Sequence, residues 1–424
     1  MKLICVDLEA GLSDIPPADR GEQWVLVRLH GHPVGFVYPD ARGCTSQDLA
    51  RLVVERHGWS IAAHLAADCL LTAPSLDLSH LPVACPRVRP TPAAVVTVAV
   101  CTRNRAGQLP ECLDALAALD YPKALLDVLI VDNAPDDDST RDLVARYPAF
   151  RYIREPRPGL DWARNRAIIE ARGDIVAYTD DDVSVDRGWV RALAVAFAEE
   201  PHAMCVTGLV VPDEIDTDAQ RLFEIYGGFG RGFARWVYRV NADAGERAAK
   251  SYGGTGRFGT GANMAFRRVF FLREGLFDPA LDVGTPANGG GDLEMFFRVL
   301  EAGHALVYEP SALVRHRHRR DYAALRTQLT NNGIGFFTYL ARTADAYPAA
   351  RGDVIRLALW WLWWWNVRRL LQSFVRPSEI PRDLMIAELK GSLAGLRRYG
   401  RSRRHAADVL RKFGLPGELT GVAT

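Results

Sequence analysis

Three consecutive aspartates, Asp180, Asp181 and Asp182, directly follow an apolar run in the stretch AYTDDDVSVD. Like charges in contact repel, and each raises the pKa of its neighbours, so the triplet is costly unless something offsets the repulsion. Mg²⁺ and Mn²⁺ prefer oxygen ligands, and Mg²⁺ usually adds substrate phosphates to its shell. In a strand the residues i and i+2 face the same side, so Asp180 and Asp182 could share one ion. The alternative is a solvated acidic turn.

The elements around the triplet predict how it is positioned. From residue 95 onward, apolar runs alternate with helical patterns, and the runs VVTVAVC, LDVLIVDNA and DIVAYTDDD are typical of buried strands. This β-α-β-α order predicts an α/β fold with a doubly wound, mostly parallel sheet. Such sheets bind ligands beyond the carboxyl ends of their strands. Polar residues follow all three predicted strands at their carboxyl ends, in CTRNR, VDNAPDDD and the aspartate triplet. We therefore expect a ligand site at the edge of the sheet where these strands end.

Two common nucleotide-binding classes are disfavoured by what the sequence lacks. No GxGxxG follows the first of these strands, and no GxxxxGK[ST] occurs, which argues against dinucleotide-binding and P-loop enzymes. The net charge of +1 gives no reason to expect nucleic acid as a partner.

Residues 95–320 resemble a family 2 glycosyltransferase of the GT-A fold. The resemblance rests on ordered motifs: VAVCTRNR, VLIVDNAPDDDST, GLDWARNRAI, YTDDDVSVDRGWV, GTGANMAFRR, and GGGDLEMFFRVLEAG followed by YEPSALVRHRHRR. It implies an inverting, metal-dependent enzyme of the hexosyltransferase type, which transfers a sugar from a nucleotide diphosphate sugar to a hydroxyl acceptor. Neither a QxxRW motif nor a set of transmembrane helices accompanies these motifs, so the resemblance implies non-processive transfer.

The resemblance also implies roles for individual residues. The cofactor would be Mg²⁺ or Mn²⁺, with Asp180, Asp182 and His316 as its ligands. Asp292 would act as the catalytic base that deprotonates the acceptor hydroxyl. The residues assigned to the nucleotide sugar are Thr102, Arg103, Asp132, Arg164, Asp180, Asp181, Gly261 and Asn263.

The acceptor motif departs from the family pattern. Where the family commonly has Glu-Asp, this chain has Gly291-Asp292. Asp292 keeps the base position, while Glu294, two residues on, could compensate for the missing acid. Both residues are therefore catalytic candidates.

Purely structural roles remain open for several of these residues. Asp292 would also serve as a helix N-cap, and Asp132 as a turn former. His316 could lie in a basic turn that binds nothing specific, and Gly261 and Asn263 could merely shape a loop. At the level of function, the alternatives are a nucleotide-sugar-binding protein without transfer activity, which the departure in the acceptor motif would explain, and a nucleotidyltransferase.

Composition divides the chain into three predicted parts. Residues 1–90 form a small N-terminal α/β domain, in which WVLVRLHGHPVGFVYPD predicts two strands and TSQDLARLVVERHGWSIAAHLAADCLL a helix. We expect this domain to shape acceptor or partner binding. A proline-rich linker, LPVACPRVRPTPAA, leads into the GT-A domain over residues 91–320. Residues 321–424 form a helical C-terminal region.

The C-terminal region is basic and rich in tryptophan. Residues 351–424 carry 14 Lys and Arg against 6 Asp and Glu, and LALWWLWWWNVRRLL has five tryptophans within six residues. Such a segment is either a helix of the core or of a homodimer, or a helix at a membrane surface, since Trp and Arg favour the membrane–water boundary. The second interpretation predicts peripheral membrane contact and suits a lipid-linked acceptor, whereas a saccharide or small-molecule acceptor stays open.

The compartment follows from the cysteines and the N-terminus. The seven cysteines form no CxxC pair, which is typical of a reducing compartment without structural disulfides. MKLICVDLEAG has acidic residues where a signal peptide would need its apolar core, and no apolar run reaches about 18 residues. We therefore predict a cytoplasmic protein, placed at the cytoplasmic membrane face if the basic region binds lipid.

Overall fold

This computed structural model describes residues 3–18, 23–67, 78, 81, 92–241 and 246–415. Nine strands of the described chain form one central mixed sheet: β4 (Val96–Thr102), β5 (Leu126–Asn133), β6 (Phe150–Glu155), β7 (Ile175–Asp180), β8 (Val183–Val185), β9 (Ala203–Pro212), β10 (Trp236–Tyr238), β11 (Asn263–Arg267) and β12 (Ala305–His316). They lie side by side in the order β10, β12, β9, β11, β7, β4, β5, β6, while β8 pairs with β12.

One half of this sheet is the parallel arrangement that the sequence predicts. β4 pairs in parallel with β5 and β7, and β5 with β6, because helices cross back over the sheet between them, namely α2 (Pro110–Ala117), α3 (Ser139–Val144) and α4 (Leu160–Glu170). Alternate strand residues enter two cores. Val98 and Ile130 pack with α2 and α5 (Trp189–Glu199), whereas Ala99 and Leu129 pack with α4, α8 (Arg268–Glu274) and α9 (Gly291–Glu301). The predicted doubly wound α/β fold is confirmed.

The other half of the sheet contains antiparallel pairs that the sequence did not predict. β11 runs antiparallel to both of its neighbours, β7 and β9. β12 lies parallel to β9, and β8 pairs antiparallel with β12 so that Val183 is opposite His316. This pairing brings the end of β12 beside the aspartate triplet, although the two are far apart in the sequence.

The N-terminal residues form a small sheet, β1 (Ile4–Asp7), β2 (Val25–Leu29) and β3 (His32–Val37), covered by α1 (Ser46–Ala67). The two predicted strands and the helix are present, and β1 adds a parallel partner to β2. This unit shares a core with the large sheet, since Leu26 packs with Leu209 and Leu313, and Nη1 of Arg28 lies 2.7 Å from Oδ2 of Asp186. Most of the predicted linker, residues 82–91, lies outside the described residues.

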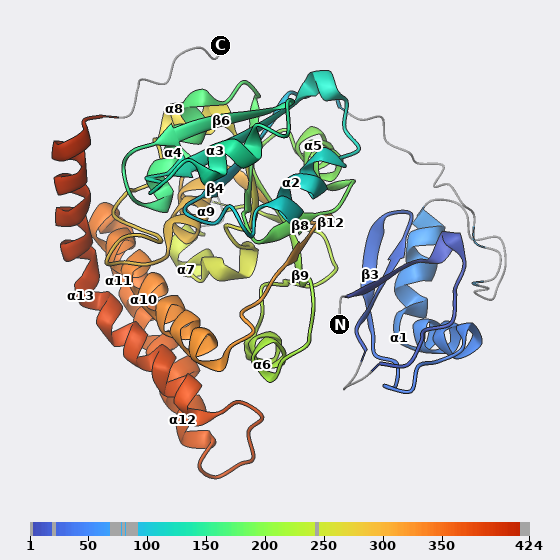
Figure 1. Cartoon of the computed structure of the whole chain (residues 1–424). Helices are drawn as coiled ribbons and strands as arrows, with labels where there is room; N and C mark the ends of the chain where they lie inside the picture. The colour runs from blue at the N-terminus through green and yellow to red at the C-terminus, as the bar shows by residue number, and fades with distance from the viewer. Residues whose placement is uncertain are drawn as a thin grey trace.

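The C-terminal helices form a layer against one side of the sheet domain (Figure 1). They are α10 (Tyr322–Ala346), α11 (Arg351–Trp361), a π-helical turn (Leu362–Val367), α12 (Arg368–Gln372) and α13 (Arg382–Phe413). α10 and α13 approach closely because a Cβ at Gly391 would lie 2.0 Å from the carbonyl oxygen of Thr330, and one at Gly395 2.6 Å from that of Ile334. The predicted helical region is thus confirmed. Among the described residues, no helix is long and apolar enough to cross a membrane.

Two short helices and a loop complete the walls of the site. α6 (Asp218–Tyr226) follows β9, and α7 (Ala248–Tyr252) precedes a glycine-rich loop that leads into β11. α6 begins with a capping box, in which the hydroxyl of Thr217 accepts a hydrogen bond from the backbone N–H of Gln220.

Candidate active site

A cavity of about 1140 Å³ opens between the carboxyl end of β7, the loop before β11, the start of α9 and the helices α10 and α11. Its wall includes Asp180, Arg164, Gly261, Asp282 and Asp292. Sites for small molecules typically measure about 300–1,000 Å³, so this cavity has room for more than one small ligand. A cavity large enough for a ligand thus lies at the sheet edge where the sequence predicts a ligand site.

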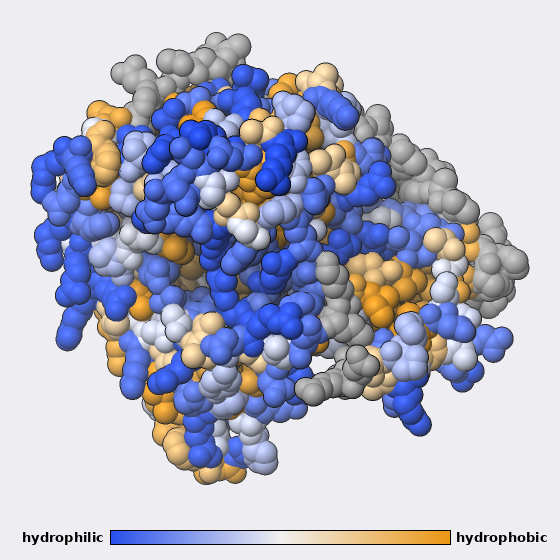
Figure 2. Space-filling model, in the orientation of Figure 1, coloured by the Kyte–Doolittle hydropathy of each residue, from blue (hydrophilic) through white to orange (hydrophobic). Residues whose placement is uncertain are grey.

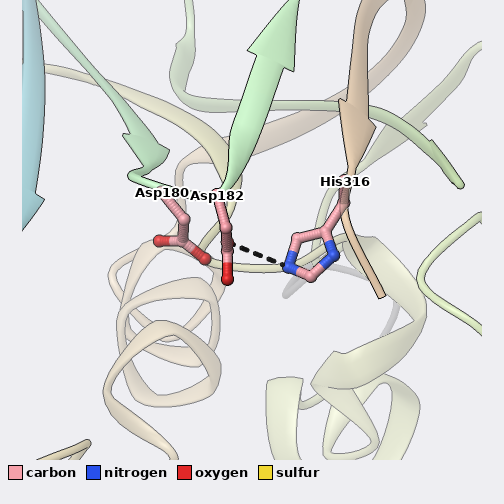
Figure 3. A group of neighbouring side chains, drawn as sticks. All are labelled: Asp180, Asp182 and His316. Carbon is pink, nitrogen blue, oxygen red and sulfur yellow. Dashed lines mark ion pairs between the residues drawn. The ribbon is translucent and has the colours of Figure 1, made fainter. Parts of the chain in front are cut away.

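Asp180, Asp182 and His316 meet beside this cavity (Figure 3). Asp180 ends β7, Asp182 lies in the turn before β8, and His316 ends β12. Each offers one ligand atom, and these atoms all lie within 4.8 Å of one another. Nε2 of His316 is 3.4 Å from Oδ1 of Asp182. Two carboxylates and an imidazole are a donor set that fits a divalent cation such as Mg²⁺ or Mn²⁺.

The charges of this group explain how an aspartate triplet can be tolerated. Burial and the neighbouring Asp182 raise the pKa of Asp180 to about 7. Burial lowers the pKa of His316 to about 4, so its imidazole is neutral at neutral pH and keeps a lone pair for a metal. Burial opposes ionisation of Asp182, yet cationic neighbours, Arg105 among them, hold its pKa below the usual value. A bound divalent cation would remove the remaining repulsion.

His316 is held by a second histidine that the sequence analysis did not assign to the site. Nδ1 of His316 lies 3.1 Å from Nδ1 of His318, and Nε2 of His318 lies 2.7 Å from Oε1 of Glu224. If His318 donates its Nε2–H to Glu224, its Nδ1 accepts the Nδ1–H of His316. That arrangement leaves the Nε2 lone pair of His316 directed towards Asp182. The spacing of the two histidines in RHRHRR was the available signal, because residues i and i+2 of an extended chain face the same side.

Asp181 and Thr102 bind each other at the ends of β7 and β4. The buried carboxylate of Asp181 accepts hydrogen bonds from the hydroxyl of Thr102 and from Nη1 of Arg105, both at 2.7 Å. Burial raises the pKa of Asp181 in spite of these donors. The pair therefore ties together the two strand ends on which the site is built.

Three residues predicted to bind the nucleotide lie along the same sheet edge without lining the cavity. Thr102 and Arg103 end and follow β4, and Asp132 lies near the end of β5. Arg103 is exposed, whereas Asp132 is buried and accepts a hydrogen bond of 2.9 Å from the hydroxyl of Tyr152. Burial raises the pKa of Asp132. Their predicted nucleotide contacts stay predictions.

Arg164 is the centre of a buried charge cluster at the cavity. Its Nη1 lies 3.0 Å from Oδ1 of Asp161 and also pairs with Asp282. Gly261 makes room for this guanidinium, since a Cβ there would lie 2.6 Å from Nη2 of Arg164. Sequence analysis predicted Arg164 and Gly261 as site residues, and both line the cavity. It did not predict Asp161 or Asp282.

Asp292 lies in the first turn of α9 and faces the cavity. Its Oδ2 accepts a hydrogen bond of 2.8 Å from the backbone N–H of Gly261, and its Oδ1 one of 2.8 Å from that of Leu293. The N-cap position itself belongs to Gly290, so Asp292 does not have the capping role considered from the sequence. Burial and the nearby Asp282 raise the pKa of Asp292, which makes it a better proton acceptor once it is ionised.

Glu294 cannot compensate for the acid missing at position 291. Its side chain is fully buried and forms ion pairs with Arg298 and Arg342, and it does not line the cavity. The geometry disfavours this candidate, because two residues along a helix turn the side chain by about 200°, from the cavity side of α9 into the core. The space beside Gly291 is instead filled by Asp161, whose Oδ2 would lie 2.4 Å from a Cβ at position 291.

Asn263 has the structural role that the sequence left open. Its Nδ2 donates hydrogen bonds to the carbonyl oxygens of Leu209 at 3.0 Å and Ala312 at 2.7 Å. Its Oδ1 accepts one of 2.8 Å from Nε1 of Trp189. Asn263 is fully buried and has no donor left for a ligand, which argues against the predicted contact with the nucleotide sugar.

An α/β domain of this type, with acidic residues at the carboxyl ends of its strands, is the architecture of GT-A glycosyltransferases, and sequence comparison agrees. Residues 97–273 match the model of the family described as Glycosyl transferase family 2. The chain therefore contains a domain that matches glycosyltransferase family 2 over these residues, and the match supports an enzyme of the glycosyltransferase class.

Individual relatives are distant. A glucosyl-dolichyl phosphate glucuronosyltransferase of Haloferax volcanii is 23% identical over 235 residues, which cover 52% of this chain and 69% of the relative. A pre-mycofactocin glycosyltransferase of Mycobacterium tuberculosis is 27% identical over 234 residues, covering 54% of this chain and only 44% of the relative. The structure of the mannosyltransferase PcManGT from Pyrobaculum calidifontis with GDP-Man and Mn²⁺ covers 85% of this chain and 86% of its own, at 19% identity. Its TM-score with this chain is 0.43.

Proposed function

We propose that this enzyme is an inverting, metal-dependent and non-processive glycosyltransferase of the hexosyltransferase type. It moves a sugar from a nucleotide diphosphate sugar to an acceptor hydroxyl. The observation that carries the proposal is the position of the Asp180–Asp182–His316 group at one end of a cavity that also contains the carboxylate of Asp292.

The proposed donor site lies where Asp180 brings the metal group to the cavity. Asp180, Asp182 and His316 would hold Mg²⁺ or Mn²⁺ there, and the ion would act as a Lewis acid that stabilises the departing nucleoside diphosphate. Asp132 and Arg103, at neighbouring strand ends, would contact the nucleoside. The guanidinium of Arg164, which pairs with Asp161 and Asp282 at the cavity, would face the donor sugar.

The proposed acceptor site lies at Asp292, in the wall of the same cavity. The two backbone N–H donors of Gly261 and Leu293 orient the carboxylate of Asp292. This carboxylate would take the proton of the acceptor hydroxyl while the acceptor oxygen forms a bond to the anomeric carbon of the donor sugar. The bond from that carbon to the diphosphate oxygen breaks with its electron pair. A single displacement of this kind inverts the anomeric centre, through a transition state that resembles an oxocarbenium ion.

The experiment that tests this function measures donor binding and turnover separately. Nucleoside diphosphates are screened by thermal shift with and without Mn²⁺, since a ligand bound to the native state raises the melting temperature. Release of the nucleoside diphosphate from nucleotide sugars is then followed for wild type and for Asp182→Ala. We expect a metal-dependent shift with one nucleotide and a loss of turnover in the variant.

Three other outcomes would decide against the proposal. Undiminished turnover in Asp182→Ala, or in excess chelator, would exclude the metal role. Nucleotide binding without turnover for any acceptor tried would favour a nucleotide-sugar-binding protein. Release of pyrophosphate from a nucleoside triphosphate would identify a nucleotidyltransferase.

A further inference from the structure

The five clustered tryptophans divide between two sides of the α11–α12 segment. Trp361 packs inward, with its ring centroid 4.5 Å from that of Phe336. Trp365 also faces inward and donates a hydrogen bond of 3.1 Å from Nε1 to Glu388. Trp360, Trp363 and Trp364 face the other way and remain 51%, 56% and 46% exposed. Packing within the chain therefore accounts for Trp361 and Trp365, whereas Trp360, Trp363 and Trp364 remain about half exposed.

The exposed tryptophans belong to a longer apolar surface. Exposed apolar residues recur about every four positions from α11 through the π-helical turn and α12, which keeps them along one side of the segment. We call this surface the tryptophan face and define it by Leu359, Trp360, Trp363, Trp364, Leu371 and Phe374. Apolar residues gather at the lower edge of the molecule, where Figure 1 places α12 (Figure 2). A contiguous apolar surface of this kind marks a protein or membrane contact.

The charge around the tryptophan face selects between these two occupants. Residues 354–376 contain four arginines and no acidic residue. The guanidinium carbon of Arg368 lies 4.1 Å from the ring centroid of Trp364, and that of Arg382 lies 4.4 Å from the ring centroid of Phe374. In a two-fold dimer through this face, the same positive surface would meet itself. An anionic bilayer instead attracts each nearby Arg by about 1 kcal/mol and accepts Trp at its interface.

The tryptophan face also continues into the cavity. Trp360, which belongs to the face, lines the cavity together with Leu357 and Trp361. The same cavity reaches Asp180 and Asp292. The cavity that holds these carboxylates is thus lined at α11 by apolar side chains, one of which belongs to the tryptophan face.

We infer that the tryptophan face docks on an anionic lipid bilayer and that the cavity receives its acceptor from that bilayer, as a hydroxyl group on a molecule with an apolar anchor. The docking stands on exposure and charge alone. The acceptor class rests on the proposed glycosyltransferase function, and it follows because a molecule held in the bilayer by its apolar chain would meet the cavity along its tryptophan-lined wall.

Docking is tested by co-sedimentation of the full chain with vesicles of phosphatidylglycerol and phosphatidylcholine, or of phosphatidylcholine alone. We expect binding to the anionic vesicles that weakens at high salt. Arg368→Gln and Arg376→Gln should each weaken it about fivefold, the equivalent of about 1 kcal/mol. Trp363→Ser/Trp364→Ser should weaken it by at least about tenfold. Trp59→Ser is the matched control, because Trp59 is 87% exposed on α1, away from this face, and its loss should change nothing.

Retention of the wild-type protein in the supernatant at low salt would overturn the docking. So would binding that the tryptophan and arginine variants leave unchanged. Light scattering after size exclusion tests whether a second copy of the chain occupies this face instead. A dimer that Trp363→Ser/Trp364→Ser dissociates, in a protein that does not bind vesicles, would identify the tryptophan face as a dimer interface.

The acceptor class is tested with radiolabelled nucleotide sugars and anionic vesicles that contain a polyprenyl phosphate sugar, whose sugar supplies the acceptor hydroxyl. Label should move into the organic phase on extraction. If nucleoside diphosphate is released but the label stays in the aqueous phase, the acceptor is not lipid-linked. If no donor is turned over or bound, the proposed function fails and the acceptor class fails with it, whereas the docking is still judged by co-sedimentation.

Discussion

Substitution of Gly291 tests how this chain accommodates the departure in its acceptor motif. Gly291 is the first residue of α9 and has no unusual backbone conformation, so a larger residue is opposed by space and not by the backbone. A Cβ would lie 2.4 Å from Oδ2 and 2.8 Å from Oδ1 of Asp161. Asp161 cannot easily yield, because it is only 1% exposed and Arg164 holds its Oδ1 at 3.0 Å. Gly291→Ala should therefore destabilise the protein.

The expected size of the effect follows from two opposing contributions. Replacing a helical glycine by alanine usually stabilises a protein by about 0.5–1 kcal/mol. Overpacking a buried site costs about 1–3 kcal/mol. We expect the clash to win, with a net loss of about 1 kcal/mol and a melting temperature lower by a few degrees. Gly352→Ala is the matched control, because Gly352 lies in the first turn of α11 and a Cβ there would meet no atom within 4 Å; this change should be neutral or stabilising.

A double-mutant cycle with Asp161→Ala isolates the contact. In the Asp161→Ala background the obstructing carboxylate is gone, so Gly291→Ala should become neutral or stabilising, a coupling of about 1–3 kcal/mol. The assay is thermal unfolding of the four proteins, with nucleoside diphosphate release as a second measurement. Gly291→Glu/Asp161→Ala should also retain more turnover than Gly291→Glu alone, since it returns an acid to this space from the other side. Equal melting temperatures for Gly291→Ala and Gly352→Ala in the wild-type background would refute the reasoning.

Three further predictions concern the metal group, the base and a buried acid. His318→Phe should weaken Mn²⁺ binding about 10–100-fold in calorimetric titration, because His318 orients His316. The control is His304→Phe, because His304 lies just before β12, at the opposite end of the strand from His316. If both variants bind Mn²⁺ with equal affinity, His318 does not orient His316. Asp292→Asn should keep nucleotide binding and lower the rate of transfer about 10²–10⁴-fold. Glu294→Gln should instead cost about 3–5 kcal/mol of stability, because it breaks a buried ion pair. A Glu294→Gln protein that is stable but inactive would make Glu294 the catalytic base in place of Asp292. Burial raises the pKa of Glu388 in spite of hydrogen bonds from Tyr226 and Trp365. At pH values between the pKa of Glu388 in the unfolded chain and its pKa in the folded protein, the folded protein therefore binds more protons than the unfolded chain. The free energy of unfolding should fall as the pH rises through this range. Glu388→Gln should flatten that fall in urea melts at several pH values, and an unchanged slope would assign it to another group.

The parallel half of the sheet was predictable because its signal is local. Each of β4, β5 and β7 is an apolar run bounded by polar residues, and each of these runs leads towards a helix that can cover the sheet. The antiparallel pairs were not predictable in this way. β11 lies between β7 and β9, and three-residue β8 pairs with the distant β12, so their placement depends on partners that no local pattern identifies.

The candidate site shows the same division. The spacing of Asp180 and Asp182 predicts a shared face, but His316 joins them only through the β8–β12 pairing, and only the family resemblance pointed to it. Helical spacing itself disfavours Glu294, because a residue two positions after Asp292 turns to another side of α9. Asp161 was missed since nothing in its own segment indicates that it packs against Gly291.

The tryptophan segment illustrates why the sequence left core and membrane open as alternatives. Its apolar residues run without a break from Leu357 to Trp365, so they cover all sides of a helix and no polar stripe marks an outer one. The choice is made by neighbours from elsewhere in the chain. Phe336 on α10 covers Trp361, and Glu388 on α13 takes the indole N–H of Trp365, which leaves Trp363 outside. Once α10 and α13 have covered one side of the segment, its charge indicates the partner of the exposed side. Arginines without acidic residues favour an anionic surface.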